Sequence, residues 1–258
     1  MASVKGVADT FDMAEQVVGQ ALRVGADAAE ALVAEGAELK VKVRLGETEL
    51  VLKRAKAKPP VQETTRSAAL NTSLDDYRRQ IEKCQKCSLG KTRIKFVFGD
   101  GDPNSKLVFV GEAPGSDEDE QGLPFVGRAG QLLTKIIEAI NFKRSQVYIC
   151  NILKCRPPDN RNPLPAEIEL CEPYLIKQLE IIKPAVICTL GTFASQTLLK
   201  TDIPISKLRG KIHYYQNIKL VPTFHPAALL RNPVWKRDTW EDVKLVRQIY
   251  DREVKNGR

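Results

Sequence analysis

The chain has 258 residues and a net charge of +8, from 40 Lys and Arg against 32 Asp and Glu. It contains no apolar run of about 18 or more residues, which excludes a membrane-spanning helix, and no basic N-terminal region that leads into an apolar core, which argues against a secretion signal. We therefore expect a soluble cytoplasmic protein with no membrane partner, and the basic excess fits a polyanionic partner.

The composition separates a short N-terminal part from a longer remainder. Residues 1–60 contain no isoleucine and hold nine basic and nine acidic residues, so the whole basic excess lies in residues 61–258. Residues 13–34 carry apolar side chains at helical spacing, and residues 39–43 and 49–52 have the pattern of two strands. The sequence thus predicts a small N-terminal α+β appendage.

This helix and strand pair resemble the N-terminal segment of the TldD/PmbA family. The resemblance covers residues 1–52 and includes none of that family's metal-site motif, so it implies no function here. We interpret residues 1–52 as an appended segment. Residues 53–73 are basic and then rich in Pro, Thr and Ser, which is typical of a flexible linker, and residues 74–258 form the main domain.

Within that domain, a glycine-rich loop follows a strand. The strand-forming run Leu107–Val110 leads into residues 111–115, which read GEAPG. An acidic run at residues 117–120 comes next, and an amphipathic helix is expected over residues 131–140. Glu and Pro interrupt a dinucleotide fingerprint, and no Gly-Lys-Ser/Thr follows to make a phosphate-binding Walker loop.

Further strands and helices alternate along the rest of the domain. The strands are expected at residues 147–153, 185–191 and 220–224, and the helices at residues 167–183, 192–200 and 238–252. This alternation predicts an α/β fold with a central parallel four-stranded sheet and helices on both faces. Because the carboxyl ends of parallel strands open on one side, the 111–115 loop, Asn151 and the 225–231 loop should meet there.

The chain has only two histidines, and their positions differ. His225 stands at the end of an expected strand, in the sequence HPAALLR. A polar group at that edge of the sheet favours a functional role. His213 lies in an expected surface hairpin, which favours a structural role.

The six cysteines fall into two groups. Cys150 and Cys188 lie within apolar strands, where a free Cys behaves as a small hydrophobic residue. The other four lie in or beside loops: Cys84, Cys87, Cys155 and Cys171. An intracellular location argues against disulfides. Four thiolates with no nearby His suit either zinc or an iron–sulfur cluster, and the spacing does not choose between them.

Together these motifs resemble a known family. The combination of GEAPG, PFVGRAG, C-x-x-C, NxxKCRPPxNRxP, the second loop cysteine and HPAALLR is similar to the family 4 uracil-DNA glycosylases, the iron–sulfur type of their superfamily. The resemblance covers about residues 74–252. It implies a monomeric enzyme that hydrolyses the N-glycosidic bond of uracil in single- or double-stranded DNA and leaves an abasic site.

The resemblance also implies roles for individual residues. A [4Fe–4S] cluster would be held by Cys84, Cys87, Cys155 and Cys171. The sugar and water side of the pocket would be formed by Gly111, Ala113, Pro114 and Gly115. The uracil ring would stack on Phe125, Asn151 would read its Watson–Crick edge, and His225 would approach O2 of the base. The duplex would be opened by Leu229 or Leu230, with Arg231 on a phosphate.

One departure concerns the attacking water. Where the better-known family 1 glycosylases carry a water-activating Asp, this chain has Ala113, as is usual in family 4, so Glu112 and Asp119 are the nearby candidate catalytic carboxylates. The branch of the superfamily that traps uracil covalently uses a His in an inserted loop, but residues 128–147 contain no His, which favours turnover. Two alternatives stay open: a glycosylase that accepts a broader range of deaminated bases, and a catalytically inactive iron–sulfur DNA-binding protein.

Overall fold

The computed structural model describes residues 28–34, 38–45, 48–53 and 73–256. The chain divides into two compact units, residues 1–70 and residues 71–258, and each is described by itself. No helix within the described ranges is long and apolar enough to cross a membrane.

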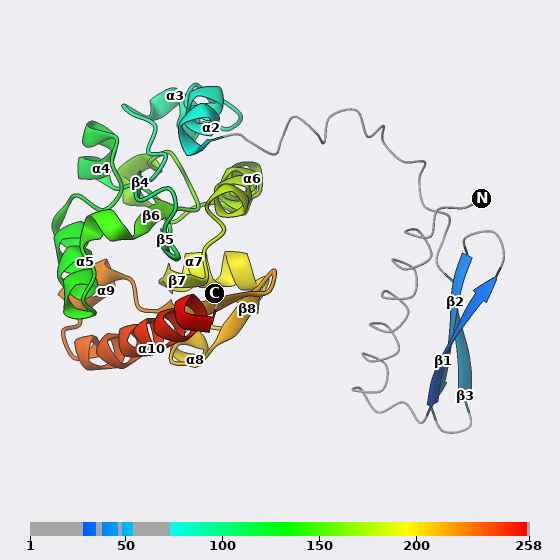
Figure 1. The fold of residues 1–258 in the computed structure, drawn as a ribbon. Helices are drawn as coiled ribbons and strands as arrows, with labels where there is room; N and C mark the ends of the chain where they lie inside the picture. The colour runs from blue at the N-terminus through cyan, green and yellow to red at the C-terminus, as the bar shows by residue number, and fades with distance from the viewer. Residues whose placement is uncertain (1–27, 35–37, 46–47, 54–72, 257–258) are drawn as a thin grey trace. The chain divides into compact units, whose positions relative to one another are not determined.

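The first unit contains a three-stranded antiparallel sheet in the order β1-β2-β3, drawn in blue in Figure 1. Its strands are β1 (Ala28–Ala34), β2 (Glu38–Leu45) and β3 (Thr48–Lys53). The two strands expected from the sequence are confirmed as parts of β2 and β3. The helix expected over residues 13–34 is wrong at residues 28–34, because these residues pair with β2 along their whole length and this pairing overrides the helix preference of alanine. Residues 13–27 and 54–72 lie outside the described residues.

The second unit is built on a six-stranded sheet in the order β4-β6-β5-β7-β9-β8. Its strands are β4 (Asp100–Gly101), β5 (Leu107–Gly111), β6 (Tyr148–Asn151), β7 (Val186–Leu190), β8 (His213–Tyr215) and β9 (Ile218–Thr223). The four central strands are parallel, which confirms the expected core of the fold. The antiparallel edge strands β4 and β8 were not expected as part of this sheet, although β8 and β9 do form the hairpin predicted around His213.

Helices precede, connect and follow these strands. They are α2 (Leu74–Ile81), α3 (Leu89–Thr92), α4 (Ser116–Gln121), α5 (Arg128–Ala139), α6 (Pro165–Ile182), α7 (Thr192–Leu199), α8 (Ile205–Leu208), α9 (Pro226–Arg231) and α10 (Trp235–Asn256), with short 3₁₀ turns η3 (Arg144–Gln146) and η4 (Pro158–Asn160). Ser73 caps α2, since its side-chain oxygen accepts from the backbone N–H of Asp76 at 3.1 Å. The HPAALLR segment, expected as a loop, forms the short helix α9, and the acidic run lies in the short helix α4.

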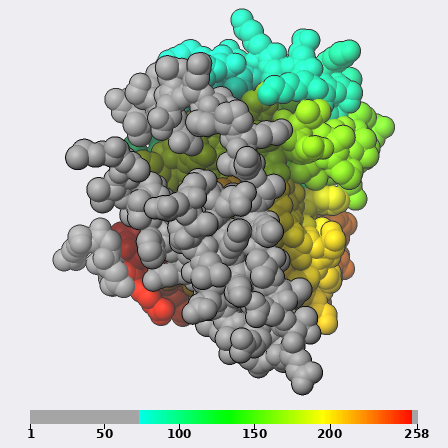
Figure 2. Space-filling view, turned by 90° about the vertical axis from the view of Figure 1, so that its right-hand side faces the viewer, coloured from blue at the N-terminus to red at the C-terminus, as the bar shows by residue number. Residues whose placement is uncertain are grey.

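Alternate residues of the central strands face two separate cores. Along β5, Val108 and Val110 belong to a core with α2, α6 and α7, whereas Leu107 and Phe109 belong to a core with α5 and α10. Figure 1 shows these two groups of helices on opposite sides of the sheet, and in the space-filling view of Figure 2 the cyan, yellow-green and yellow colours of α2, α6 and α7 follow one another down one side. Successive side chains of a strand point to opposite faces of the sheet, and helices cover both faces. The central strands are therefore continuously hydrophobic, as in other covered parallel sheets.

Candidate active site

A cavity of about 670 Å³ opens at the carboxyl ends of the central strands. Its walls come from the segments that follow the four central strands: the loop after β5, the end of β6 with the η4 segment, the start of α7 after β7, and the segment from the end of β9 into α9. Ile205 of α8 and Trp235 of α10 complete the lining. This is the edge at which open α/β sheets bind their ligands. The structure therefore brings together Glu112, Ala113, Phe125, Asn151 and His225, which were singled out from distant parts of the sequence.

Gly111 lets Asn151 and Phe125 stand close to the end of β5. It is the last residue of β5 and pairs in register with Asn151 at the end of the neighbouring strand β6. A Cβ at this position would lie 2.3 Å from Asn151 Oδ1 and 2.5 Å from Cζ of Phe125. Only glycine therefore allows the amide and the ring to stand this close to the strand end.

Asn151 has a buried side-chain oxygen with no hydrogen-bond partner among the described residues. Its side chain is 1% exposed, and the unpaired atom is Oδ1. Buried polar atoms are nearly always paired, so an unpaired one at a cavity wall is suited to a ligand. Lys154, which sequence reasoning assigned no role, holds the backbone in place by donating from Nζ to the Asn151 carbonyl at 2.7 Å.

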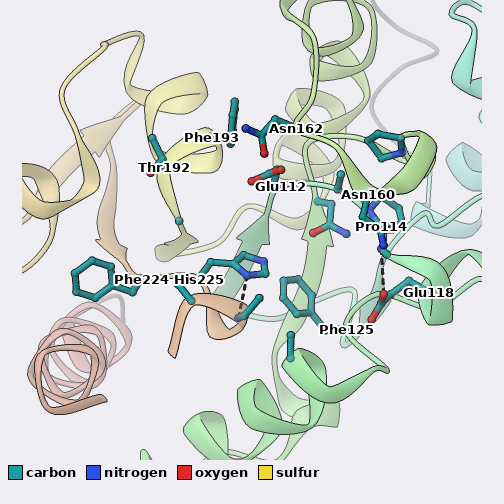
Figure 3. Close-up of a pocket in the computed structure, with 18 of the residues that line it drawn as sticks. Glu112, Pro114, Glu118, Phe125, Asn160, Asn162, Thr192, Phe193, Phe224 and His225 are labelled. Carbon is teal, nitrogen blue, oxygen red and sulfur yellow. Dashed lines mark hydrogen bonds between the residues drawn. The ribbon is translucent and has the colours of Figure 1, made fainter. Parts of the chain in front are cut away.

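Phe125 forms one side of the same space. It is 6% exposed and has a left-handed backbone, with φ of +53°, an unfavourable conformation for a bulky residue. Helix α5 approaches so closely that a Cβ on Gly130 would lie 1.9 Å from the Phe125 carbonyl. The ring lies 5.5 Å from that of His225, centroid to centroid, with a tilt of 33° (Figure 3). Surrounding structure thus holds a strained residue as one wall of the cavity.

Glu118 organises the loop that carries these groups, and sequence reasoning missed it. Its carboxylate accepts from the backbone N–H groups of Gly115, Val126 and Gly127 at 2.9–3.0 Å, and the first of these bonds is drawn in Figure 3. Gly115 and Glu118 have the spacing of a helix-capping box, a signal that could have identified the contact.

His225 is held as a neutral hydrogen-bond donor. Its Nδ1 accepts from the backbone N–H of Ala227 at 3.1 Å, at the start of α9, so the proton of the neutral ring lies on Nε2. Burial lowers the pKa of His225 to about 4, with a smaller contribution from the positive charge of Arg231. The ring is uncharged at neutral pH and points toward Phe125 in Figure 3.

The two candidate carboxylates lie in different places. Glu112 lines the cavity, and Figure 3 shows it on the same side as Asn162 and Phe193. Burial raises the pKa of Glu112 to about 7. The structure does not bring Asp119 to the cavity: it is 3% exposed, and its Oδ1 accepts from the backbone N–H of Ile94 at 3.0 Å. The reason is the helical turn of about 100° per residue, which points Asp119 away from the loop that Glu118 holds.

Of the leucines in the HPAALLR segment, only one is accessible. Leu229 is 1% exposed and packs inside the second unit, whereas Leu230 is 40% exposed. Arg231, at the end of α9, lines the cavity. Leu229 therefore does not present a free side chain at the surface, and Leu230 does.

Cys84, Cys87, Cys155 and Cys171 belong to one apolar cluster, and Cys171, which was expected in or beside a loop, lies within helix α6. Cys155 and Cys171 are buried in it, and Cys84 and Cys87 pack against it half-exposed. Their sulfurs receive three hydrogen bonds, one of them from the backbone N–H of Lys86 to Cys84 Sγ at 3.5 Å. The Tyr174 hydroxyl donates to Cys84 Sγ at 3.1 Å, and the Arg93 guanidinium donates to Cys155 Sγ at 3.3 Å.

As free thiols, the two buried cysteines of this set resist ionisation. Burial raises the pKa of Cys171 to about 11 and raises that of Cys155 as well. Within the described ranges, no three His, Cys, Asp or Glu side chains stand in the arrangement of an assembled metal site. The chemistry of this set, four thiols from three segments with donors aimed at sulfur, fits a thiolate-bound cluster.

The fold and the cavity define a class of protein. A parallel α/β sheet places an aromatic wall, an amide with an unpaired oxygen and a neutral imidazole around one space, which is a set suited to holding a planar heterocyclic base. Residues 98–244 match the sequence profile of the uracil DNA glycosylase superfamily.

Comparison with individual proteins narrows this class. The chain is 45% identical to a type-4 uracil-DNA glycosylase from Archaeoglobus fulgidus over 185 residues, which cover 69% of this chain and 93% of that protein. It is 42% identical to a type-4 uracil-DNA glycosylase from Thermotoga maritima over 178 residues, 67% of this chain and 93% of that protein. A type-5 uracil-DNA glycosylase from Pyrobaculum aerophilum is 27% identical over 146 residues, 50% of this chain and 64% of that protein. The chain belongs to the type-4 uracil-DNA glycosylase family.

Proposed function

We propose that this protein is a DNA-repair glycosylase that flips uracil out of DNA and hydrolyses its N-glycosidic bond, leaving an abasic site. The observation that carries the proposal is the unpartnered side-chain oxygen of Asn151, in one cavity with the Phe125 ring and a neutral His225. Membership of the type-4 family supports uracil in DNA as the substrate. The protein would act as a monomer in the cytoplasm.

Phe125 and Asn151 would capture the flipped base. Extrusion of a base from a duplex costs roughly a few kcal/mol, and stacking on an aromatic ring recovers about 1–3 kcal/mol. An amide presents one donor and one acceptor in fixed geometry, so Asn151 can pair with O4 and N3–H of uracil but is mismatched to the amine and ring nitrogen of cytosine. The amide is already buried, so a bound base that does not pair with it leaves a buried polar group unsatisfied. That loss of hydrogen bonding disfavours binding of such a base.

His225 would stabilise the departing base. Cleavage of the glycosidic bond leaves negative charge on N1 and O2 of uracil, and an Nε2–H donor at O2 acts where that charge develops. The neutral form of the ring is fixed by burial and by the bond that Nδ1 accepts from Ala227. The donor is therefore pre-oriented and does not depend on protonation of the ring at neutral pH.

Glu112 would assist the attacking water. Its pKa of about 7 places its change of charge near neutral pH, where a carboxylate can accept a proton from water. Ala113, the next residue in the cavity wall, has no side chain that could do so. We therefore assign Asp119 to holding the segment at Ile94 and keep Glu112 as the candidate base.

Leu230 and Arg231 would contact the DNA beside the cavity. An exposed apolar side chain can occupy the gap that a flipped base leaves, and Leu230 is the accessible member of its pair. Arg231 lines the cavity at the end of the same helix, where a cation can bind the neighbouring phosphate and so position the strand.

Cys84, Cys87, Cys155 and Cys171 would hold a [4Fe–4S] cluster. When bound, the cluster would supply a structural cross-link between the segment after α2, the segment after β6 and helix α6. The hydrogen bonds from Arg93 and Tyr174 would stabilise the thiolate form of the ligands. Cys155 lies four residues after Asn151, so this cross-link would also support the base-reading end of β6.

The direct test is incubation of the purified protein with oligonucleotides that carry one uracil, followed by alkaline cleavage at abasic sites. We expect strand breaks at uracil and none in a matched cytosine or thymine oligonucleotide. Oligonucleotides with hypoxanthine or xanthine test the broader base range. Tight binding of uracil DNA without any cleavage would identify an inactive DNA-binding protein and overturn the proposal.

A further inference from the structure

A continuous exposed segment borders the cavity beyond its uracil-reading end. Residues 231–237, which read RNPVWKR, are all exposed and run from the end of α9 into the first turn of α10. Val234 is 85% exposed and Trp235 is 37% exposed. Arg231, Lys236 and Arg237 add three positive charges to the segment, and no ion pair among the described residues neutralises them. An apolar and basic surface of this kind fits a single nucleic-acid strand.

Trp235 is held in place by a stack of side chains. Its ring lies 4.6 Å from that of Phe224, centroid to centroid, with the two planes only 12° apart. The Arg209 guanidinium also lies over the Phe224 ring, 5.4 Å from its centroid. Phe224 directly precedes His225, so the stack is tied to the same strand end as the proposed leaving-group donor.

The cavity has room for more than the flipped uracil. Its volume of about 670 Å³ is in the range that holds drug-sized ligands, which are larger than one pyrimidine. Phe125, Asn151 and His225 gather at one part of it, and Phe224 with Trp235 lines another. The wall therefore contains a second aromatic surface that the recognition of uracil does not use.

We propose that Trp235 stacks on the base of the nucleotide next to the flipped uracil, while Arg231, Lys236 and Arg237 contact the adjoining phosphates. The inference rests on the proposed function. An unpaired base has a free face for the indole, whereas a neighbour within a duplex is already stacked and paired. Trp235 thus favours uracil in single-stranded DNA over uracil in duplex DNA.

Fluorescence tests the contact directly, because the chain has only two tryptophans, Trp235 and Trp240. Trp240 is 41% exposed on α10, beside a separate apolar pocket, and serves as the matched control. A Trp240→Phe variant reports on Trp235 alone, and a Trp235→Phe variant reports on Trp240 alone. The probe is a single-stranded oligonucleotide with one 2′-fluorinated deoxyuridine, which resists cleavage. We expect strong quenching of Trp235 and little change in Trp240; equal quenching of both, or none in Trp235, overturns the proposal.

Kinetics separate stacking from a merely structural role. Trp235→Ala should raise KM for single-stranded uracil DNA about tenfold with kcat retained, since one lost base stack typically costs about 5–150-fold. The same variant should change duplex cleavage less than about threefold, and Trp235→Phe should restore most of the loss. An equal loss on both substrates would overturn the inference while leaving uracil excision intact. A wild-type protein that cleaves neither substrate would instead overturn the proposed function.

Discussion

Replacement of Gly111 by alanine tests the geometry of the cavity with the smallest possible change. The added methyl carbon would lie 2.3 Å from Asn151 Oδ1 and 2.5 Å from the Phe125 ring, both well inside van der Waals contact. The backbone of Gly111 is not in the left-handed range of φ, so its conformation is one that alanine can adopt. The clash must be relieved by displacement of the amide or the ring, each by roughly 1 Å, to reach an ordinary contact of about 3.5 Å.

Such a displacement acts on rate more than on folding. Overpacking of this size costs typically about 1–3 kcal/mol of stability, and a misplacement of about 1 Å at a reacting centre can cost about 10²-fold in rate. We expect Gly111→Ala to remain folded with single-turnover uracil cleavage reduced about 100-fold or more. The assay is single-turnover cleavage of a uracil oligonucleotide, with thermal unfolding measured in parallel.

Gly127→Ala is the matched control. Its added carbon would lie 2.4 Å from the Asp117 carboxylate, which is the end of a flexible side chain and can swing away. We expect cleavage within about fivefold of wild type, because a helix-cap change from Gly to Ala costs at most about 1 kcal/mol. Wild-type rates in Gly111→Ala, or equal losses in both variants, would refute the reasoning that Gly111 sets the positions of Asn151 and Phe125.

Four further predictions follow from the other groups. His225→Ala should lower the single-turnover rate about 10²–10³-fold with a much smaller effect on DNA binding, because the hydrogen bond to O2 strengthens only in the transition state; near wild-type cleavage would remove His225 from the mechanism. Burial raises the pKa of Glu112 to about 7, so its protonated carboxyl stabilises the folded state fully at pH values below its ordinary pKa of 4.5. This stabilisation is lost as the pH rises through 7. Unfolding free energy measured across this range should therefore fall less in Glu112→Gln than in wild type, and the rise of cleavage rate through pH 7 should be absent from the variant; parallel pH profiles would exclude Glu112. Cys84→Ser should abolish the broad visible absorbance of anaerobically purified protein, whereas Cys150→Ser should retain it, and colourless wild-type protein with stoichiometric zinc would contradict the cluster. Deletion of residues 1–60 should leave uracil cleavage largely intact, and a folded, cluster-containing but inactive truncation would show that the appendage takes part.

The sequence by itself determined the elements of the main unit and the edge at which they meet. Short apolar runs separated by amphipathic ones specify parallel strands covered by helices, because one-sided and two-sided burial leave different periodicities in the chain. Once the sheet is parallel, its carboxyl ends must share one side, so the GEAPG loop, Asn151 and His225 could be grouped before any contact was known. The two strand cysteines, Cys150 and Cys188, could likewise be separated from the other four by their neighbours alone, although Cys171 lies in helix α6 and not in a loop.

Where two residues of the same type are adjacent in one short segment, only the tertiary structure decided which of them makes a given contact or reaches the surface. Glu118 and Asp119 are adjacent carboxylates, yet one binds three amides of the loop and the other anchors the backbone at Ile94. Leu229 and Leu230 are adjacent as well, and only the second reaches the surface. Each choice depends on the rotation of a helix of only six residues, and that rotation is set by partners elsewhere in the chain. Local periodicity cannot specify it, because one or two turns carry too few apolar positions to define a buried face.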